Sequence, residues 1–71
     1  THGKPEDSFA RIANYWSVYL EGDVTSKDVA IMMTLLKVAR LDENPTNADN
    51  WIDACGYLAC GGEIVRSEVP R

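Results

Sequence analysis

The sequence predicts an all-α fold, a small three-helix bundle whose core is completed by oligomerisation. Apolar residues recur at helical spacing in three segments, and a helix-start signal precedes each segment. The 71 residues form one domain, residues 1–71. A chain this short buries only about 60% of its surface, so a partner subunit is a common way to complete the core. Because the chain begins at Thr1 and not at methionine, we expect further residues before it.

The first predicted helix begins at Pro5 and ends at Gly22. Proline is favoured in the first turn of a helix, and glycine commonly follows the last turn. The stripe expected to face the core consists of Phe9, Ile12, Ala13, Trp16 and Leu20. Tyr15 and Tyr19 lie one turn apart beside this stripe, and two uses stay open for them: a contact between subunits, or stacking on a base.

The second predicted helix begins at Thr25 and runs to about Leu41. Thr25 and Asp28 have the spacing of a capping box in which Asp replaces Glu. The helix is apolar on nearly every side, through Val29, Ile31, Met32, Met33, Leu35, Leu36, Val38 and Ala39. Such a helix must be enclosed, and two neighbouring helices cannot enclose it. We therefore expect another subunit to cover the remaining side.

Pro45, followed by Thr46 and Asp49 at capping-box spacing, predicts the start of a third helix that continues to about Arg66. A helical wheel places an apolar group on one side: Trp51, Ala54, Cys55, Leu58, Ala59, Gly62 and Val65. The other side is acidic but lacks bulk, with Asp49, Asp53, Gly56, Cys60 and Glu63. Small residues between carboxylates leave room for an ion, a ligand or a closely packed helix.

Composition excludes several classes of protein. The net charge of −4 and the pI near 4.7 give no basic field, which argues against binding to duplex nucleic acid. No apolar stretch approaches the roughly 18 residues of a membrane span, so no membrane partner is expected. Cys55 and Cys60, five residues apart on one helix, cannot bridge each other without unwinding it. We interpret them as reduced packing residues of an intracellular protein.

Two cations near the end of the second helix lie opposite two carboxylates near the start of the third. Lys37 and Arg40 are one turn apart, and so are Asp49 and Asp53. Each pair lies where the helix dipole favours its charge. In one interpretation Arg40 and Lys37 bind a phosphate group, since Arg offers a bidentate fork and Lys a mobile charge. In the other, the four residues pair across the turn and serve the fold alone.

The carboxylates of the third helix also have a functional and a structural interpretation. Asp49, Asp53 and Glu63 are candidate ligands for Mg²⁺, which takes carboxylate oxygens and retains waters. Asp pairs at this spacing are also common on solvated helices. Tyr57, one turn after Asp53, would donate its hydroxyl to the same network or fill a packing gap. The sequence contains no nucleophile with a plausible base, no glycine-rich phosphate loop and no zinc-ligand spacing.

Three segments also resemble, in order and separation, a small phage and prophage domain family of unknown function. The matching residues are Gly3-x-Pro5-x-x-Ser8-Phe9-x-x-Ile12-Ala13-x-x-Trp16-x-x-Tyr19-Leu20, Asp28-Val29-Ala30-x-Met32-Met33-x-Leu35-Leu36-Lys37-x-Ala39-Arg40 and Asp49-x-x-x-Asp53-x-x-Gly56-Tyr57. That family looks distantly similar to the all-α nucleoside triphosphate pyrophosphohydrolases of the MazG and dUTPase-like group. These are helical oligomers that hold Mg²⁺ with Glu-x-x-Glu and Glu-x-x-Asp motifs. Here Asn50-Trp51-Ile52-Asp53 replaces the second motif, and the first is absent.

The residues and the resemblance together predict a phage-type protein that binds a nucleotide or another phosphorylated small molecule. Lys37, Arg40, Asp49, Asp53 and Tyr57 are its candidate ligand-binding residues. If the protein is an enzyme, the resemblance implies Mg²⁺-dependent pyrophosphate hydrolysis, although two of the four expected metal ligands are absent. The alternative is a non-catalytic phage protein that sequesters a host defence nucleotide or binds a host protein. Either would act in the cytoplasm of an infected or lysogenic bacterium, as a homo-oligomer.

Overall fold

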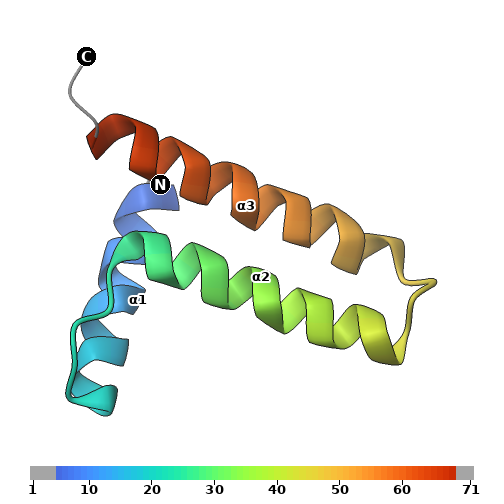
Figure 1. The fold of residues 1–71 in the computed structure, drawn as a ribbon, viewed down its shortest axis with the longest axis horizontal. Coiled ribbons are helices and arrows are strands. Elements are labelled where there is room, and N and C mark those ends of the chain that lie inside the picture. The colour runs from blue at the N-terminus through green and yellow to red at the C-terminus, as the bar shows by residue number, and fades with distance from the viewer. Residues whose placement is uncertain (1–4, 69–71) are drawn as a thin grey trace.

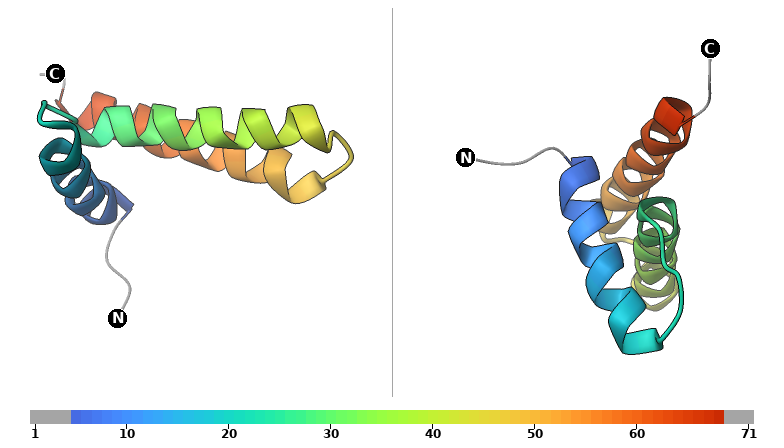
Figure 2. Two further views of the ribbon diagram at one scale, coloured as in Figure 1. Left: turned by 90° about the horizontal axis from the view of Figure 1, so that it is seen from below. Right: turned by 90° about the vertical axis from the view of Figure 1, so that its left-hand side faces the viewer.

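The computed structural model describes residues 5–68, which form three helices. They are α1 (Pro5–Leu20), α2 (Ser26–Glu43) and α3 (Ala48–Glu68) (Figure 1). α2 and α3 run antiparallel and side by side, and α1 crosses one end of this pair (Figures 1 and 2). The predicted all-α class is confirmed, and each predicted helix boundary lies within two residues of the observed one. Among these residues no helix is long and apolar enough to cross a membrane.

The end of α1 is fixed by its own backbone. The N–H of Gly22 donates to the carbonyl of Ser17 (3.1 Å), and the N–H of Glu21 donates to that of Val18 (3.3 Å). This is the Schellman arrangement, which needs a left-handed residue just after the helix. Glu21, with φ of 53°, takes that conformation. Gly22 therefore marks the end of the helix, as predicted, but the residue before it adopts the left-handed backbone.

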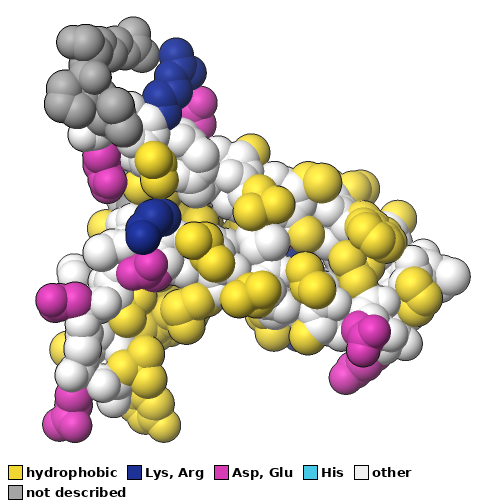
Figure 3. Space-filling model, viewed as in Figure 1, with side chains coloured by type: hydrophobic (Ala, Val, Ile, Leu, Met, Phe, Trp, Pro, Cys, Tyr) yellow, Lys and Arg dark blue, Asp and Glu magenta, His cyan; other side chains and the backbone are white. Residues whose placement is uncertain are grey.

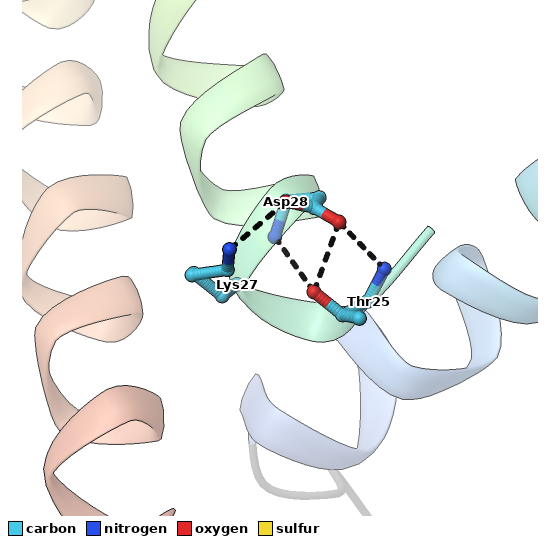
Figure 4. Close-up of polar contacts among 3 residues, drawn as sticks. All are labelled: Thr25, Lys27 and Asp28. Carbon is cyan, nitrogen blue, oxygen red and sulfur yellow. Dashed lines mark hydrogen bonds and ion pairs between the residues drawn. The ribbon is translucent and has the colours of Figure 1, made fainter. Parts of the chain in front are cut away.

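The predicted capping box at the start of α2 is confirmed (Figure 4). The Thr25 hydroxyl accepts from the Asp28 N–H (3.4 Å), and the Asp28 carboxylate accepts from the Thr25 N–H (2.9 Å) and hydroxyl (3.0 Å). These donors, the backbone N–H first, hold the pKa of Asp28 below its usual value of 3.8, with a smaller contribution from Lys27 at 3.4 Å. The box fixes the direction in which α2 leaves α1.

The start of α3 differs from the prediction. Asn47, not Thr46, supplies the cap: its side-chain oxygen accepts from the N–H of Asn50 at 3.2 Å. Thr46 instead donates its hydroxyl to the Asn44 side chain at 3.1 Å. Asparagine is at least as good a helix cap as threonine, and it lies one residue nearer the helix.

The hydrophobic core lies where the three helices meet. It consists of Phe9, Ala13, Val29, Ala30 and Ile64, with Ile12, Trp16, Val24, Met33, Tyr57 and Cys60 packed around it. The predicted stripe of α1 is confirmed except for Leu20, which is 56% exposed because it lies at the last residue of the helix, past the core. α2 and α3 approach closely at Gly61, where an added Cβ would lie 2.9 Å from that of Ala30.

The predicted apolar side of α3 is not the side that packs. Of that group only Ala54 is buried, whereas Trp51 and Leu58 are 54% and 57% exposed. The buried residues of α3 are instead Asn50, Ala54 and Ile64. The close approach at Gly61 turns small residues such as Gly61 and Ala54 toward α2 and leaves Trp51 and Leu58 outside. Cys55 is exposed, so its predicted packing role is wrong within this chain, and both cysteines are free as predicted.

Candidate functional site

The site is built from charged residues on α2 and α3 and from a hollow beside them. Lys37 of α2 places its Nζ 2.9 Å from Oδ2 of Asp53 on α3. The Lys37 side chain is only 14% exposed, whereas that of Asp53 is 45% exposed. Burial of Lys37 between the helices explains why its charge needs a partner, since an unpaired buried ammonium is costly. The pairing interpretation of the four charges therefore holds for these two residues.

The other two charges do not pair. Within residues 5–68 neither Arg40 nor Asp49 makes an ion pair, and both side chains are exposed. Arg40 follows Lys37 by one turn toward the loop that joins α2 to α3, and Asp49 lies in the first turn of α3 near the same loop. The structure thus brings the four predicted residues to one half of the helix pair. It leaves one cation, Arg40, with its guanidinium donors available.

A shallow hollow of about 360 Å³ opens between α1 and α3. It is lined by Phe9, Ile52, Asp53, Gly56, Tyr57 and Cys60. The rings of Phe9 and Tyr57 lie 6.2 Å apart at 40°, a tilted arrangement that forms an aromatic wall. A Cβ added at Gly56 would meet nothing within 4 Å, so the small residue keeps the hollow open. The predicted neighbours Asp53 and Tyr57 therefore share one concave surface.

The candidate Mg²⁺ ligands are not gathered into one site. Asp49 and Asp53 are one turn apart, but Glu63 follows Asp53 by ten residues, which is about 15 Å along a helix. Glu63 instead lies 3.5 Å from Arg66 on the surface. The described part of the chain holds no group of three or more His, Cys, Asp or Glu side chains suited to a metal. Because the three carboxylates are not gathered together, we derive no chemistry through that ion.

Sequence reasoning missed part of the hollow. Phe9 was expected only as a core residue, and Ile52 was assigned no role, yet both line the hollow. No local signal identifies them, because the hollow exists only where α1 crosses α3. Cys60, placed by the wheel beside Asp53 and Gly56 on the less bulky side of α3, lines it together with them.

Fold and site together define a small all-α domain in which a partly buried ion pair lies beside a shallow aromatic hollow. The chain belongs to the family described as Domain of unknown function (DUF6378), whose profile matches residues 1–65. It is 37% identical over 71 residues to the Gene 55 protein of Mycobacterium phage L5, covering 99% of this chain and 44% of that protein. It is 35% identical over 68 residues to the Gene 55 protein of Mycobacterium phage D29, covering 96% of this chain and 45% of that protein.

The chain therefore spans less than half the length of these curated relatives. No solved structure matches it. The predicted membership in a phage domain family of unknown function is confirmed. The more distant similarity to pyrophosphohydrolases stays a prediction.

Proposed function

We propose that this phage-type domain binds a nucleotide or another phosphorylated small molecule on the side of α2 and α3 where the hollow opens. The observation that carries the proposal is the position of Asp53, which both lines the hollow and holds Lys37 at 2.9 Å. One turn from Lys37, Arg40 is exposed and makes no ion pair within residues 5–68. The Lys37 ammonium thus contacts a residue that lines the concave surface, in a chain whose net charge is −4.

The two parts of the site suit the two parts of such a ligand. Arg40 offers a planar set of donors for phosphate oxygens, and Lys37 has two N–H donors beyond the one directed at Asp53. The apolar hollow with Phe9 and Tyr57 suits the ring or carbon portion. Its volume of about 360 Å³ lies within the range of roughly 300–1,000 Å³ common for small-molecule sites.

The proposal concerns binding and does not extend to hydrolysis. Asp49 and Asp53 would supply at most two carboxylates to a ligand-borne Mg²⁺. Hydrolysis by the mechanism of the pyrophosphohydrolases requires more metal ligands than the described part of this chain brings together. Sequestration of a nucleotide without turnover needs only the binding site. Product analysis separates the two, because sequestration returns the nucleotide unchanged.

The test is calorimetric titration with ribonucleoside and deoxyribonucleoside triphosphates, cyclic nucleotides and inorganic pyrophosphate, each with and without Mg²⁺. We expect Arg40→Gln to weaken binding of the best ligand at least about tenfold, the loss of one charge-assisted contact. Arg11→Gln is the matched control, because Arg11 is an exposed cation of α1 that does not line the hollow. Equal affinity for the Arg40 variant and the parent, or no binding by any of these ligands, would overturn the proposal.

A second candidate function is supported by a different observation. Large apolar side chains remain exposed on both long helices, among them Ile52 at 66% and Leu35 at 59%. Exposed apolar patches of this kind mark protein-interaction surfaces. Binding to a host protein is therefore the alternative, and affinity capture with the Leu35→Glu variant as control tests it.

A further inference from the structure

One side of the helix pair is apolar and uncovered. Figure 2 shows α1 on one side of α2 and α3, and no other helix of residues 5–68 covers the opposite side. Helical periodicity places Ile31, Leu35 and Val38 on the side of α2 turned away from the core residues Val29 and Met33. On α3 the same rule places Trp51, Leu58 and Val65 on the side opposite the hollow. We call these six residues the outer apolar face; each is between 39% and 59% exposed.

Charge on this side of the molecule is confined to its two ends. Figure 3 shows hydrophobic side chains across α2 and α3, with Lys, Arg and several acidic side chains near the α1 end and acidic side chains near the opposite tip. At the α1 end the cations are Lys27 and Arg66. On the surface, Lys27 pairs with Asp28 at 3.4 Å and Arg66 pairs with Glu63 at 3.5 Å. At the tip α2 ends in Asp42 and Glu43, both exposed and without an ion pair within residues 5–68.

We propose that a second copy of this chain packs on the outer apolar face in an antiparallel, two-fold arrangement, forming a four-helix bundle. In a two-fold contact the same surface serves both partners, so it must be complementary to itself. Reversing one copy brings its Lys27 and Arg66 toward Asp42 and Glu43 of the other, and the symmetry makes this contact twice. The uncharged middle of the face in one copy then contacts the same region of the other copy.

The area is of the size that a stable dimer needs. A half-exposed large side chain contributes on the order of 100 Å², so the six residues give roughly 600 Å² per chain. Small residues between them, including Cys55 and Gly62, add to this figure and permit close approach. A standard interface buries about 800 Å² per partner. A second copy on this face also supplies the cover that an apolar helix such as α2 requires.

Light scattering on the 71-residue chain at 1–200 μM, a range chosen around typical dimer affinities, is the first test. The proposal expects a mass of 2 × 7.9 kDa. Leu35→Glu and Leu58→Glu should each shift the chain to a monomer by burying a charge in the interface. Val18→Glu is the matched control, because Val18 is 78% exposed but lies on α1, and it should stay dimeric. A monomeric parent chain, or equal dissociation of the control, would overturn the proposal.

Cross-linking provides a test that does not depend on how these variants fold. Cys55 is exposed near the middle of the outer apolar face, and Cys60 lines the hollow on the other side of α3. A short bismaleimide should link two copies of the Cys60→Ser variant through Cys55. It should not link the Cys55→Ser variant. Equal cross-linking of the two variants would contradict this face.

A charge exchange tests the orientation. The double variant Lys27→Glu, Arg66→Glu replaces the cations of the α1 end, and the double variant Asp42→Lys, Glu43→Lys replaces the acidic residues of the tip. Antiparallel packing predicts that each double variant dimerises at least about tenfold more weakly than the parent at low salt, and that a mixture of the two restores dimers. Unchanged dimers of each variant alone would show that the orientation is wrong.

Discussion

The two ends of the α2 and α3 pair are built in opposite ways. Where α1 crosses, the interior is apolar and closed, with Phe9, Val29 and Ile64 buried. Toward the tip the seam between the helices holds polar groups: Thr34 and Asn50 are buried, and Lys37 pairs with Asp53. Apart from Leu41, which is buried, the large apolar side chains of this half are exposed, among them Leu35, Val38 and Trp51. The α1 end thus has a closed hydrophobic core, whereas the tip half exposes apolar side chains that a partner would cover.

The contrast shows how three helices of similar hydrophobicity come to have different roles. Leu41 and Ala54 are buried toward the tip, but the hydrophobic core cluster forms only where α1 joins the pair, and α1 crosses the pair instead of running along it (Figure 1). Thr34 illustrates the tip half, since it satisfies its buried hydroxyl by donating to the Ala30 carbonyl at 2.8 Å. Within the described residues no buried side-chain nitrogen or oxygen lacks a hydrogen-bond partner, so polar groups can be tolerated in this seam.

The largest effect is expected at the closed end. Phe9→Ala should lower the free energy of unfolding by about 3–5 kcal/mol, the transfer and cavity cost of a buried aromatic side chain. Urea denaturation followed by circular dichroism measures it. Val18→Ala, at a position 78% exposed, should change the value by less than about 0.5 kcal/mol. Similar losses for the two variants would mean that the core is not concentrated at this end.

Two glycines of α3 separate close packing from open surface. Gly61→Ala should cost about 1–3 kcal/mol through overpacking, because the new Cβ would lie 2.9 Å from the Ala30 Cβ and the helices would have to move apart. Gly56→Ala meets nothing within 4 Å and should gain up to about 1 kcal/mol from helix propensity. Thermal unfolding of both variants under one buffer condition checks the opposite signs. If both substitutions stabilise the protein, the close approach at Gly61 does not explain which side of α3 packs against α2.

The capping box should matter by an intermediate amount. Thr25→Ala is expected to lower stability by about 1 kcal/mol at neutral pH, a typical loss for a helix cap. Because folding lowers the pKa of Asp28, its contribution is present above the usual value of 3.8 and is lost as the pH falls through the lower folded value. Asp28→Asn should therefore flatten the pH dependence of stability below about pH 4. An unchanged acid profile in this variant would contradict the role of the box.

The smallest effect is expected in the polar seam. A double-mutant cycle with Lys37→Met and Asp53→Asn should give a coupling free energy of about 0.2–1 kcal/mol, because Asp53 is 45% exposed and water screens the pair. Urea denaturation of the parent, both single variants and the double variant measures it. Arg40→Met, which removes no ion pair within residues 5–68, should leave stability within about 0.5 kcal/mol. A coupling free energy of several kcal/mol would instead mean that the polar seam stabilises the fold as much as the core does.

The local elements of this protein were determined by the sequence itself. The all-α class, the helix boundaries to within two residues and the Thr25–Asp28 box follow from periodicity and capping, which act between residues close in the chain. The phage family also follows from the order of residues along the chain. Pairing of the cations on α2 with the carboxylates on α3 was one of two interpretations left open by the sequence, and it holds for Lys37 and Asp53.

Only the tertiary structure decided which sides of the helices are buried and which charges meet. The wheel favoured Trp51 and Leu58 as packing residues because it weighs hydrophobicity, but helix approach is set by small residues such as Ala30 and Gly61. The choice of Asp53 over Asp49 as the partner of Lys37, and the hollow that Phe9 completes, likewise depend on helix rotation and on the path of α1. These are contacts between residues far apart in the chain, which no local pattern encodes.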